Sequence, residues 1–135
     1  AAELLLWPWA RQWVPAVAGD ERTWEPVNEE QGKYWTTRYP VDALFGMQAL
    51  VEGARSAPLE GIHAPVLVVH SRDDPVIRPG AVVEAYERLG SANKHRLEMS
   101  GARDPHVLAG EIMSPGRTER VVEEVSAWLS SVVAP

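Results

Sequence analysis

The stretch at residues 64–79, APVLVVHSRDDPVIRP, constrains the fold of this chain more than any other. It begins with a continuous apolar run, Val66 to Val69, which is bounded by Pro65 and by a polar turn. A short run of β-branched residues without polar alternation is typical of a strand that is buried on both faces of a parallel sheet. The turn that follows is charged, and open α/β sheets place ligand sites at the carboxyl ends of their strands. We therefore expect a buried parallel strand with functional residues just after it.

The rest of the chain predicts an alternation of helices and strands. Regular elements are expected in four further places: a strand at 94–99 and helices at 41–55, from Pro79 onwards and at 118–133. Gly90 is predicted to be a left-handed cap at the end of the helix that begins at Pro79. Residues 19–40 have no regular period and are predicted to be a loop. The pattern indicates an α/β fold, with parallel strands and flanking helices.

These strands are too few for a complete domain of this class. Two parallel strands do not cover both faces of a sheet or remove its edges, although 135 residues is an ordinary length for one domain. The chain also opens with Ala1 and Ala2 rather than with Met. We therefore expect an incomplete domain, from either a processed chain or a piece of a longer one.

Composition argues against several classes of function. The net charge is −6 and the basic residues are scattered, which argues against a nucleic-acid surface. The absence of cysteine excludes disulfides, a thiol nucleophile and Cys-based metal sites. The apolar start, residues 1–19, is interrupted by Glu3, Arg11 and two prolines, so neither a signal peptide nor a membrane span is expected. We expect a cytoplasmic protein without a metal or cofactor.

Two polar loops follow the expected strands. The first reads SRDDPVI at residues 71–77, and the second reads GARDPHVL at residues 101–108. Together they resemble the C-terminal part of the α/β-hydrolase family, in which such loops carry the acid and the histidine of the catalytic triad. The resemblance covers residues 62–129. Aligned on the family's Asp-Pro-hydrophobic step, it implies Asp74 as the acid and His106 as the histidine, with Asp73 as the less favoured acid.

The nucleophile that this resemblance requires is not in the sequence. In a serine hydrolase the histidine takes the proton of the nucleophile, and the carboxylate orients the imidazole. In this fold the nucleophile precedes the acid along the chain, so it should lie upstream of Asp74. No serine here has glycines two positions before and after it, as the G-x-S-x-G elbow needs. The nucleophile would therefore be a serine on another segment, or an aspartate as in the family's dehalogenases and epoxide hydrolases.

The resemblance implies a function and a division of the chain. Residues 1–58 look like a helical lid, and residues 59–135 look like the C-terminal part of the core. The implied function is that of a carboxylesterase or lipase-like hydrolase acting on a small ester, completed by a missing N-terminal half. The alternative is a non-catalytic fragment that self-associates or binds a partner across the open sheet edge.

Several single residues have more than one interpretation. Leu6, Trp9 and Trp13 share one helical stripe. Trp7, Trp9 and Trp13 would line an apolar acyl site, or the tryptophans would simply pack in a core. A metal site at His70, Asp73 and Asp74 is conceivable, but a spaced ligand set is missing and none is predicted. Arg72 and Asp73 are expected to form a solvated pair.

Overall fold

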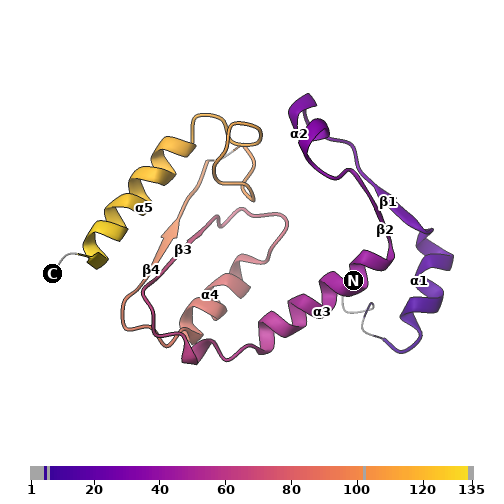
Figure 1. Cartoon of the computed structure of the whole chain (residues 1–135), viewed down its shortest axis with the longest axis horizontal. Helices are drawn as coiled ribbons and strands as arrows, with labels where there is room; N and C mark the ends of the chain where they lie inside the picture. The colour runs from indigo at the N-terminus through magenta and orange to yellow at the C-terminus, as the bar shows by residue number, and fades with distance from the viewer. Residues whose placement is uncertain (1–4, 6, 102, 134–135) are drawn as a thin grey trace. The chain divides into compact units, whose positions relative to one another are not determined.

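Figure 1 shows the chain as a computed structural model, which describes residue 5, residues 7–101 and residues 103–133. It is a mixed α/β protein that divides into two compact units, Ala1–Ala57 and Pro58–Pro135. Within the described residues each unit has one two-stranded sheet, antiparallel in the first and parallel in the second. None of the helices described has the length and apolar character that crossing a membrane requires.

In its described residues, the first unit contains a strand pair and three α-helices. β1 (Glu21–Thr23) pairs with β2 (Arg38–Pro40), and the helices are α1 (Ala10–Ala18), α2 (Glu29–Tyr34) and α3 (Asp42–Ser56). The core of the unit joins α1 to the start of α3, where Ala10, Val14, Val41 and Phe45 are buried together. Burial of these apolar side chains stabilises the unit.

The prediction of a loop between α1 and α3 is wrong. Asn28 caps α2, because its side chain accepts the N–H of Gln31 at 2.8 Å, and the Gln31 side chain in turn accepts the N–H of Val27 at 2.8 Å. The rings of Trp24 and Trp35 meet edge to face, with centroids 6.4 Å apart. These contacts involve polar and aromatic residues without a regular spacing, so a search for an apolar period does not detect them.

The start of α1 also differs from the prediction. Leu6 lies outside the described residues, and Trp9 has a left-handed backbone with φ 69°, so the helix begins only at Ala10. The side chains that α1 buries are the small ones, Ala10 and Val14. Trp9 and Trp13 stay exposed. The predicted tryptophan stripe is therefore not the buried face.

The second unit is built on parallel strands. β3 (Val66–His70) pairs with β4 (Lys94–Glu98) in a register that runs from Val66 opposite Lys94 to His70 opposite Glu98. The short 3₁₀ helix η2 (Leu59–Gly61) precedes β3, α4 (Pro79–Arg88) connects the strands, and α5 (Thr118–Val133) follows the loop after β4. The strands and helices predicted in this unit are confirmed to within one residue at each predicted end.

The helices α4 and α5 cover opposite faces of the strand pair β3–β4, as Figure 1 shows. Side chains alternate along a strand. Leu67 lies on one face, where it lines a groove with Trp128 of α5. Lys94 and Arg96 lie on the other face, where their cationic groups are 5.0 and 5.7 Å from the ring centroid of Tyr86 in α4. Within the described part of this unit, α4 and α5 cover the faces of the strand pair and not the carboxyl ends of its strands.

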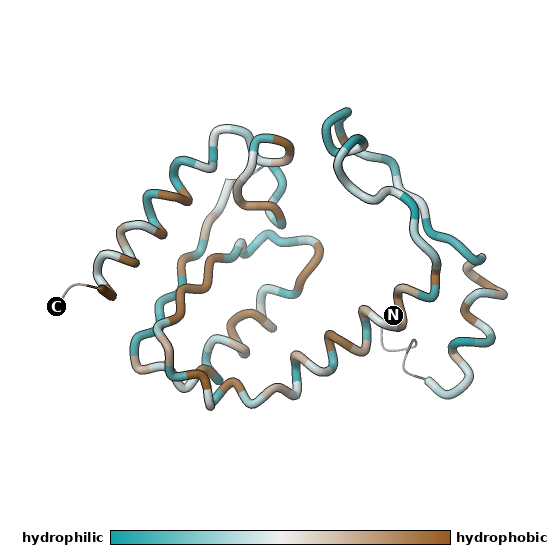
Figure 2. The backbone as a smooth tube through the Cα atoms, viewed as in Figure 1, coloured by the Kyte–Doolittle hydropathy of each residue, from teal (hydrophilic) through white to brown (hydrophobic). Residues whose placement is uncertain are grey.

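β3 is less buried than predicted. Residues 66–69 are half-buried and only His70 is buried. The reason is that β4 is the only strand neighbour of β3 in the described part of the chain, so one edge of β3 has no partner strand. Figure 2 shows the apolar strand giving way to hydrophilic residues at its carboxyl end.

The prediction that Gly90 is a left-handed cap is also wrong. Gly90 does not have a positive φ, and Leu89 caps α4 instead. The ammonium group of Lys94 donates to three carbonyls at this helix end, those of residues 86, 87 and 89. Gly90 is needed for a different reason: a Cβ there would lie 1.9 Å from the carbonyl oxygen of Glu60 in η2. The glycine permits close packing of two backbone segments.

Replacing Gly90 by Ala is therefore expected to destabilise the chain by about 1 to 3 kcal/mol, the usual cost of overpacking. Gly80, in the first turn of α4, is the matched control, since a Cβ there meets nothing within 4 Å. Gly80→Ala should leave the stability unchanged or raise it by up to about 1 kcal/mol. Urea unfolding followed by circular dichroism measures both. Equal stabilities for the two variants would contradict the close approach.

Candidate active site

Two loops meet at the carboxyl edge of the parallel strand pair. The loop after β3 carries Asp74, and the loop after β4 carries His106. Adjacent parallel strands end at the same edge of a sheet, so the loops that follow them are neighbours. Nδ1 of His106 lies 3.0 Å from Oδ2 of Asp74, which is hydrogen-bond distance. The structure thus brings together the two side chains that the sequence singles out.

The two partners differ in burial. The Asp74 side chain is 5% exposed, whereas the His106 side chain is 40% exposed. The buried carboxylate accepts a hydrogen bond from Nδ1 of the ring, and Nε2 on the other edge has no hydrogen-bond partner among the described residues. An imidazole held in this way can exchange a proton through Nε2 with a group that approaches from outside.

The carboxylate of Asp74 is ionised at neutral pH. Burial raises its pKa, but the hydrogen bond from His106 lowers it, and so do those from the backbone N–H groups of Ile77 and Val76. The hydrogen bonds together prevail, so the pKa lies below the ordinary value of 3.8. Because the pKa is lower in the folded state, the interaction stabilises the fold above the unfolded pKa. This stabilisation is lost as the pH falls through the lowered value.

Each of the two loops contains the same local turn. Oδ1 of Asp74 accepts the N–H groups of Val76 and Ile77, at 2.7 and 3.0 Å. Oδ1 of Asp104 likewise accepts the N–H groups of the residues two and three positions later, His106 and Val107, at 2.9 and 3.2 Å. In both loops proline follows the aspartate. Aspartate side chains commonly close turns in this way. Asp74 therefore has one oxygen fixed by its own loop and the other on the imidazole.

Asp104 is a residue that the sequence analysis missed. It shapes the loop that carries His106, and the signal that could have found it is the repeated dipeptide Asp-Pro, at residues 74–75 and 104–105. The same four-residue pattern occurs at both places: Asp-Pro is followed by two residues whose N–H groups donate to the aspartate side chain.

Comparison with known proteins gives no assignment. No protein-family model matches this chain, and a search of curated proteins finds no match to it. The assignment to the α/β-hydrolases therefore stays a prediction, which rests on the residues of the two loops and on their spacing along the chain.

The other charged residues of the first loop do not join the pair. Arg72 forms an ion pair with Glu98 at the end of β4, with 2.8 Å between Nη2 and Oε1. The expected Arg72–Asp73 pair is therefore wrong, because the parallel register places the Glu98 carboxylate within reach of the arginine. The Asp73 side chain is exposed and has no partner in the part of the chain that the structure describes. Asp74, not Asp73, contacts the histidine.

His70 lies at the end of β3 and is 5% exposed. Neither of its ring nitrogens has a hydrogen-bond partner within the described residues. No group of three or more His, Cys, Asp or Glu side chains that could hold a metal occurs in those same residues.

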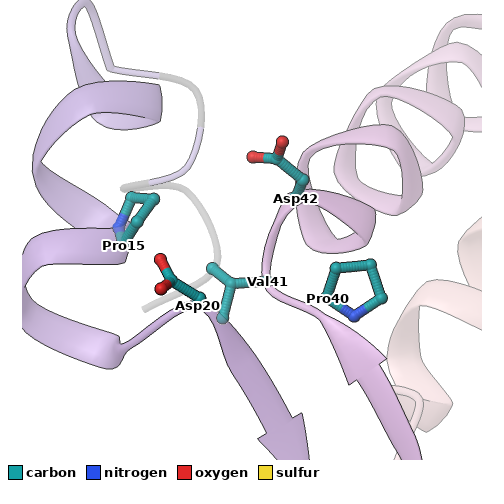
Figure 3. Close-up of a pocket in the computed structure, with 5 residues that line it drawn as sticks. All are labelled: Pro15, Asp20, Pro40, Val41 and Asp42. Atoms are coloured by element: carbon teal, nitrogen blue, oxygen red, sulfur yellow. The ribbon is translucent and has the colours of Figure 1, made fainter.

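The three tryptophans assigned to a substrate site lie in the first unit. Trp7, Trp9 and Trp13 are all exposed. None of them lines the pocket of that unit that Figure 3 shows, which is formed by Pro15, Asp20, Pro40, Val41 and Asp42. Their contact with substrate stays a prediction.

The geometry predicts the tautomer of His106. An ionised carboxylate can only accept hydrogen bonds, so in the neutral ring Nδ1 must carry the proton and Nε2 must be the free base. Nitrogen-15 NMR of the histidine ring in the full chain at a pH where the ring is neutral should therefore report Nδ1–H. The same spectrum of Asp73→Asn should be unchanged. A ring that is protonated on Nε2 in the unmodified chain would contradict the pairing.

Proposed function

We propose that this chain supplies the acid and the base of a catalytic triad in a serine hydrolase of the α/β-hydrolase kind, acting on carboxylic esters. Asp74 would orient the ring of His106, and Nε2 would take the proton of a nucleophile on a segment outside this sequence. The 3.0 Å contact between the two side chains, with Nε2 unengaged, is the observation that carries the proposal. Below, this chain together with the nucleophile-bearing segment is called the assembled enzyme.

The chemistry follows from the positions of the two ring nitrogens. When Nε2 removes the proton of a serine hydroxyl, the ring becomes a cation, and the Asp74 carboxylate stabilises that cation at 3.0 Å. The proton then passes from Nε2 to the leaving alcohol, and a water molecule repeats the cycle on the acyl intermediate. Exposure of the ring is required for both transfers, and 40% of the His106 side chain is exposed.

The substrate class is inferred from the residues near the pair. Val76 and Ile77 lie in the same loop as Asp74, two and three residues after it, and are exposed. Apolar side chains beside a base favour an apolar acyl group over a charged one. We propose esters with an aliphatic acyl chain, with Trp7, Trp9 and Trp13 as further candidate contacts.

A fluorophosphonate probe tests the proposal, because an activated serine displaces its fluoride and forms a stable bond to phosphorus. The probe should label the assembled enzyme on a serine outside this sequence, and His106→Ala should abolish labelling. His95→Ala is the control, since His95 is an exposed histidine of β4 outside the pair. Labelling that does not depend on His106 would overturn the proposal. Failure to label, with oxygen-18 from water incorporated into an aspartate during turnover, would instead identify an aspartate nucleophile.

A second candidate function is a non-catalytic module that binds a partner chain. It is favoured by the free edge of β3 in the described residues and by the absence of an elbow serine in the sequence. Purification of the chain from its native source discriminates between the two functions. A companion with a G-x-S-x-G elbow supports the hydrolase, and a companion without any such nucleophile supports the module.

A further inference from the structure

The loop that carries His106 has little regular structure of its own, and a short turn at residues 110–117 holds it in place. Ser114 in this turn is 1% exposed. Its hydroxyl donates to the carbonyl of Val107 and lies 3.4 Å from the carbonyl of Asp104. These two carbonyls flank His106 in the sequence, so the buried hydroxyl bonds the backbone after the histidine and makes a longer contact with the backbone before it.

Arg117 holds the beginning of the same loop. Its Nη2 donates to the carbonyl of Ser100 at 2.6 Å, and its Nη1 donates to the carbonyl of Gly101 at 3.3 Å. Gly101, three residues after the end of β4, has φ +71°, a conformation that favours glycine. The guanidinium presents donors on two separate nitrogens in one plane, and the single ammonium nitrogen of a lysine does not reproduce this fixed arrangement.

The turn itself is closed by its own hydrogen bonds. The N–H of Ser114 donates to the carbonyl of Gly110 at 3.0 Å, and the N–H of Arg117 donates to the carbonyl of Ser114 at 3.2 Å. Thr118 at the start of α5 accepts the N–H of Gly110 at 3.0 Å. Ser114 and Arg117 therefore lie in a turn that is hydrogen-bonded to the first residue of α5, a sixteen-residue helix. This helix is a rigid element compared with the loop that carries His106.

We propose that Ser114 and Arg117 are positioning residues for His106, acting through the loop backbone to keep the imidazole on Asp74. The expected effect on kcat rests on the proposed function. The expected effect on the position of the imidazole does not. Among the described residues, neither side chain has a hydrogen bond to the imidazole. Both hold carbonyls at residues 100, 101, 104 and 107, and a site held by such supporting contacts keeps its productive geometry.

The test uses Ser114→Ala and Arg117→Lys in the full chain. Nitrogen-15 NMR of the His106 ring reports the Nδ1–H tautomer, and the amide spectrum reports the fold. Both variants should stay folded and lose the preference for Nδ1–H. In the assembled enzyme, kcat should fall about 10²-fold, as expected for a misplacement of about 1 Å, with little change in KM.

Ser130→Ala and Arg120→Lys are the matched controls. Ser130 also donates its hydroxyl to a carbonyl, that of Ser126 at 2.8 Å, but on the exposed side of α5. Arg120 is an exposed arginine one turn after Arg117. Both control variants should keep the tautomer and the turnover of the unmodified protein.

The outcomes separate this inference from the proposed function. Folded Ser114→Ala and Arg117→Lys chains whose His106 ring is indistinguishable from that of the unmodified chain would overturn the positioning role. Should Ser114→Ala unfold, the more accessible Arg117→Lys decides the matter. Both variants could lose the Nδ1–H preference of His106 while the protein shows no hydrolysis with any nucleophile-bearing segment. That result would support the positioning role and reject the hydrolase.

Discussion

Replacing Asp74 by Asn is expected to lower kcat of the assembled enzyme by about 10⁴-fold, the size of effect that the same replacement has in a serine protease triad. The reason lies in the two oxygens of the carboxylate. Oδ1 accepts two backbone N–H groups, from Val76 and Ile77. An asparagine must keep its oxygen there, so its NH₂ group takes the place of Oδ2 and points a donor at His106. The ring must then carry its proton on Nε2, where it cannot accept one from a nucleophile.

Hydrolysis of 4-nitrophenyl acetate by the assembled enzyme measures this effect. Asp73→Asn is the matched control, one position away and with an exposed side chain, and it should change kcat by less than about threefold, as expected for a surface substitution away from the reacting groups. The Asp74→Asn chain should remain folded, because asparagine can close the same turn. Comparable losses for the two variants would reject the assignment of Asp74 as the acid.

The second large effect concerns assembly through the free edge of β3. Ladder bonds at both ends of the strand, from Val66 N–H to the carbonyl of Asn93 and from Met99 N–H to the carbonyl of His70, show which backbone groups face β4. Because these groups alternate along a strand, those of Val68 also face β4, and those of Val69 face the free edge. An unpaired edge of an apolar strand is a site for pairing with another chain. The isolated chain is therefore expected to form dimers or larger species in sedimentation velocity.

Two proline substitutions test this assignment. Val69→Pro removes an N–H group at the free edge and should give a folded monomer, since proline is tolerated at an open edge. Val68→Pro removes an N–H group that bonds β4 and should unfold the second unit. An unmodified chain that sediments as a folded monomer at all concentrations, without a partner, would reject the edge as an assembly site.

Elements with a regular apolar period could be predicted from the sequence, and elements held by specific contacts could not. β3 and α5 were predictable because Val66 to Val69 form a continuous apolar run and because α5 repeats apolar residues at helical spacing. The strand pair of the first unit was not predictable, because β1 and β2 are three residues long and expose most of their side chains. Its order depends on the Asn28 cap and on a pair of tryptophan rings.

In the candidate site, too, some residues could be predicted from a sequence pattern and others could not. Asp74 and His106 could be found because each follows a recognisable strand in a loop with a familiar pattern. The residues that hold the His106 loop could not be found, because Ser114 and Arg117 bind backbone carbonyls. Every residue has a backbone carbonyl, so the residue types in the sequence do not indicate such a contact. Gly90 shows the same limit: its partner is a backbone oxygen, that of Glu60.

The paired Asp-Pro turns have a consequence for how the site would come together. Each turn is closed by hydrogen bonds that span only two or three residues, from Oδ1 of Asp74 or Asp104 to the N–H groups just after it. Contacts of such short range form early and independently of distant parts of a fold. The acid and the base would thus be ordered before any nucleophile-bearing segment arrives. That segment would bind to loops that are already ordered, so binding would cost this chain little conformational entropy.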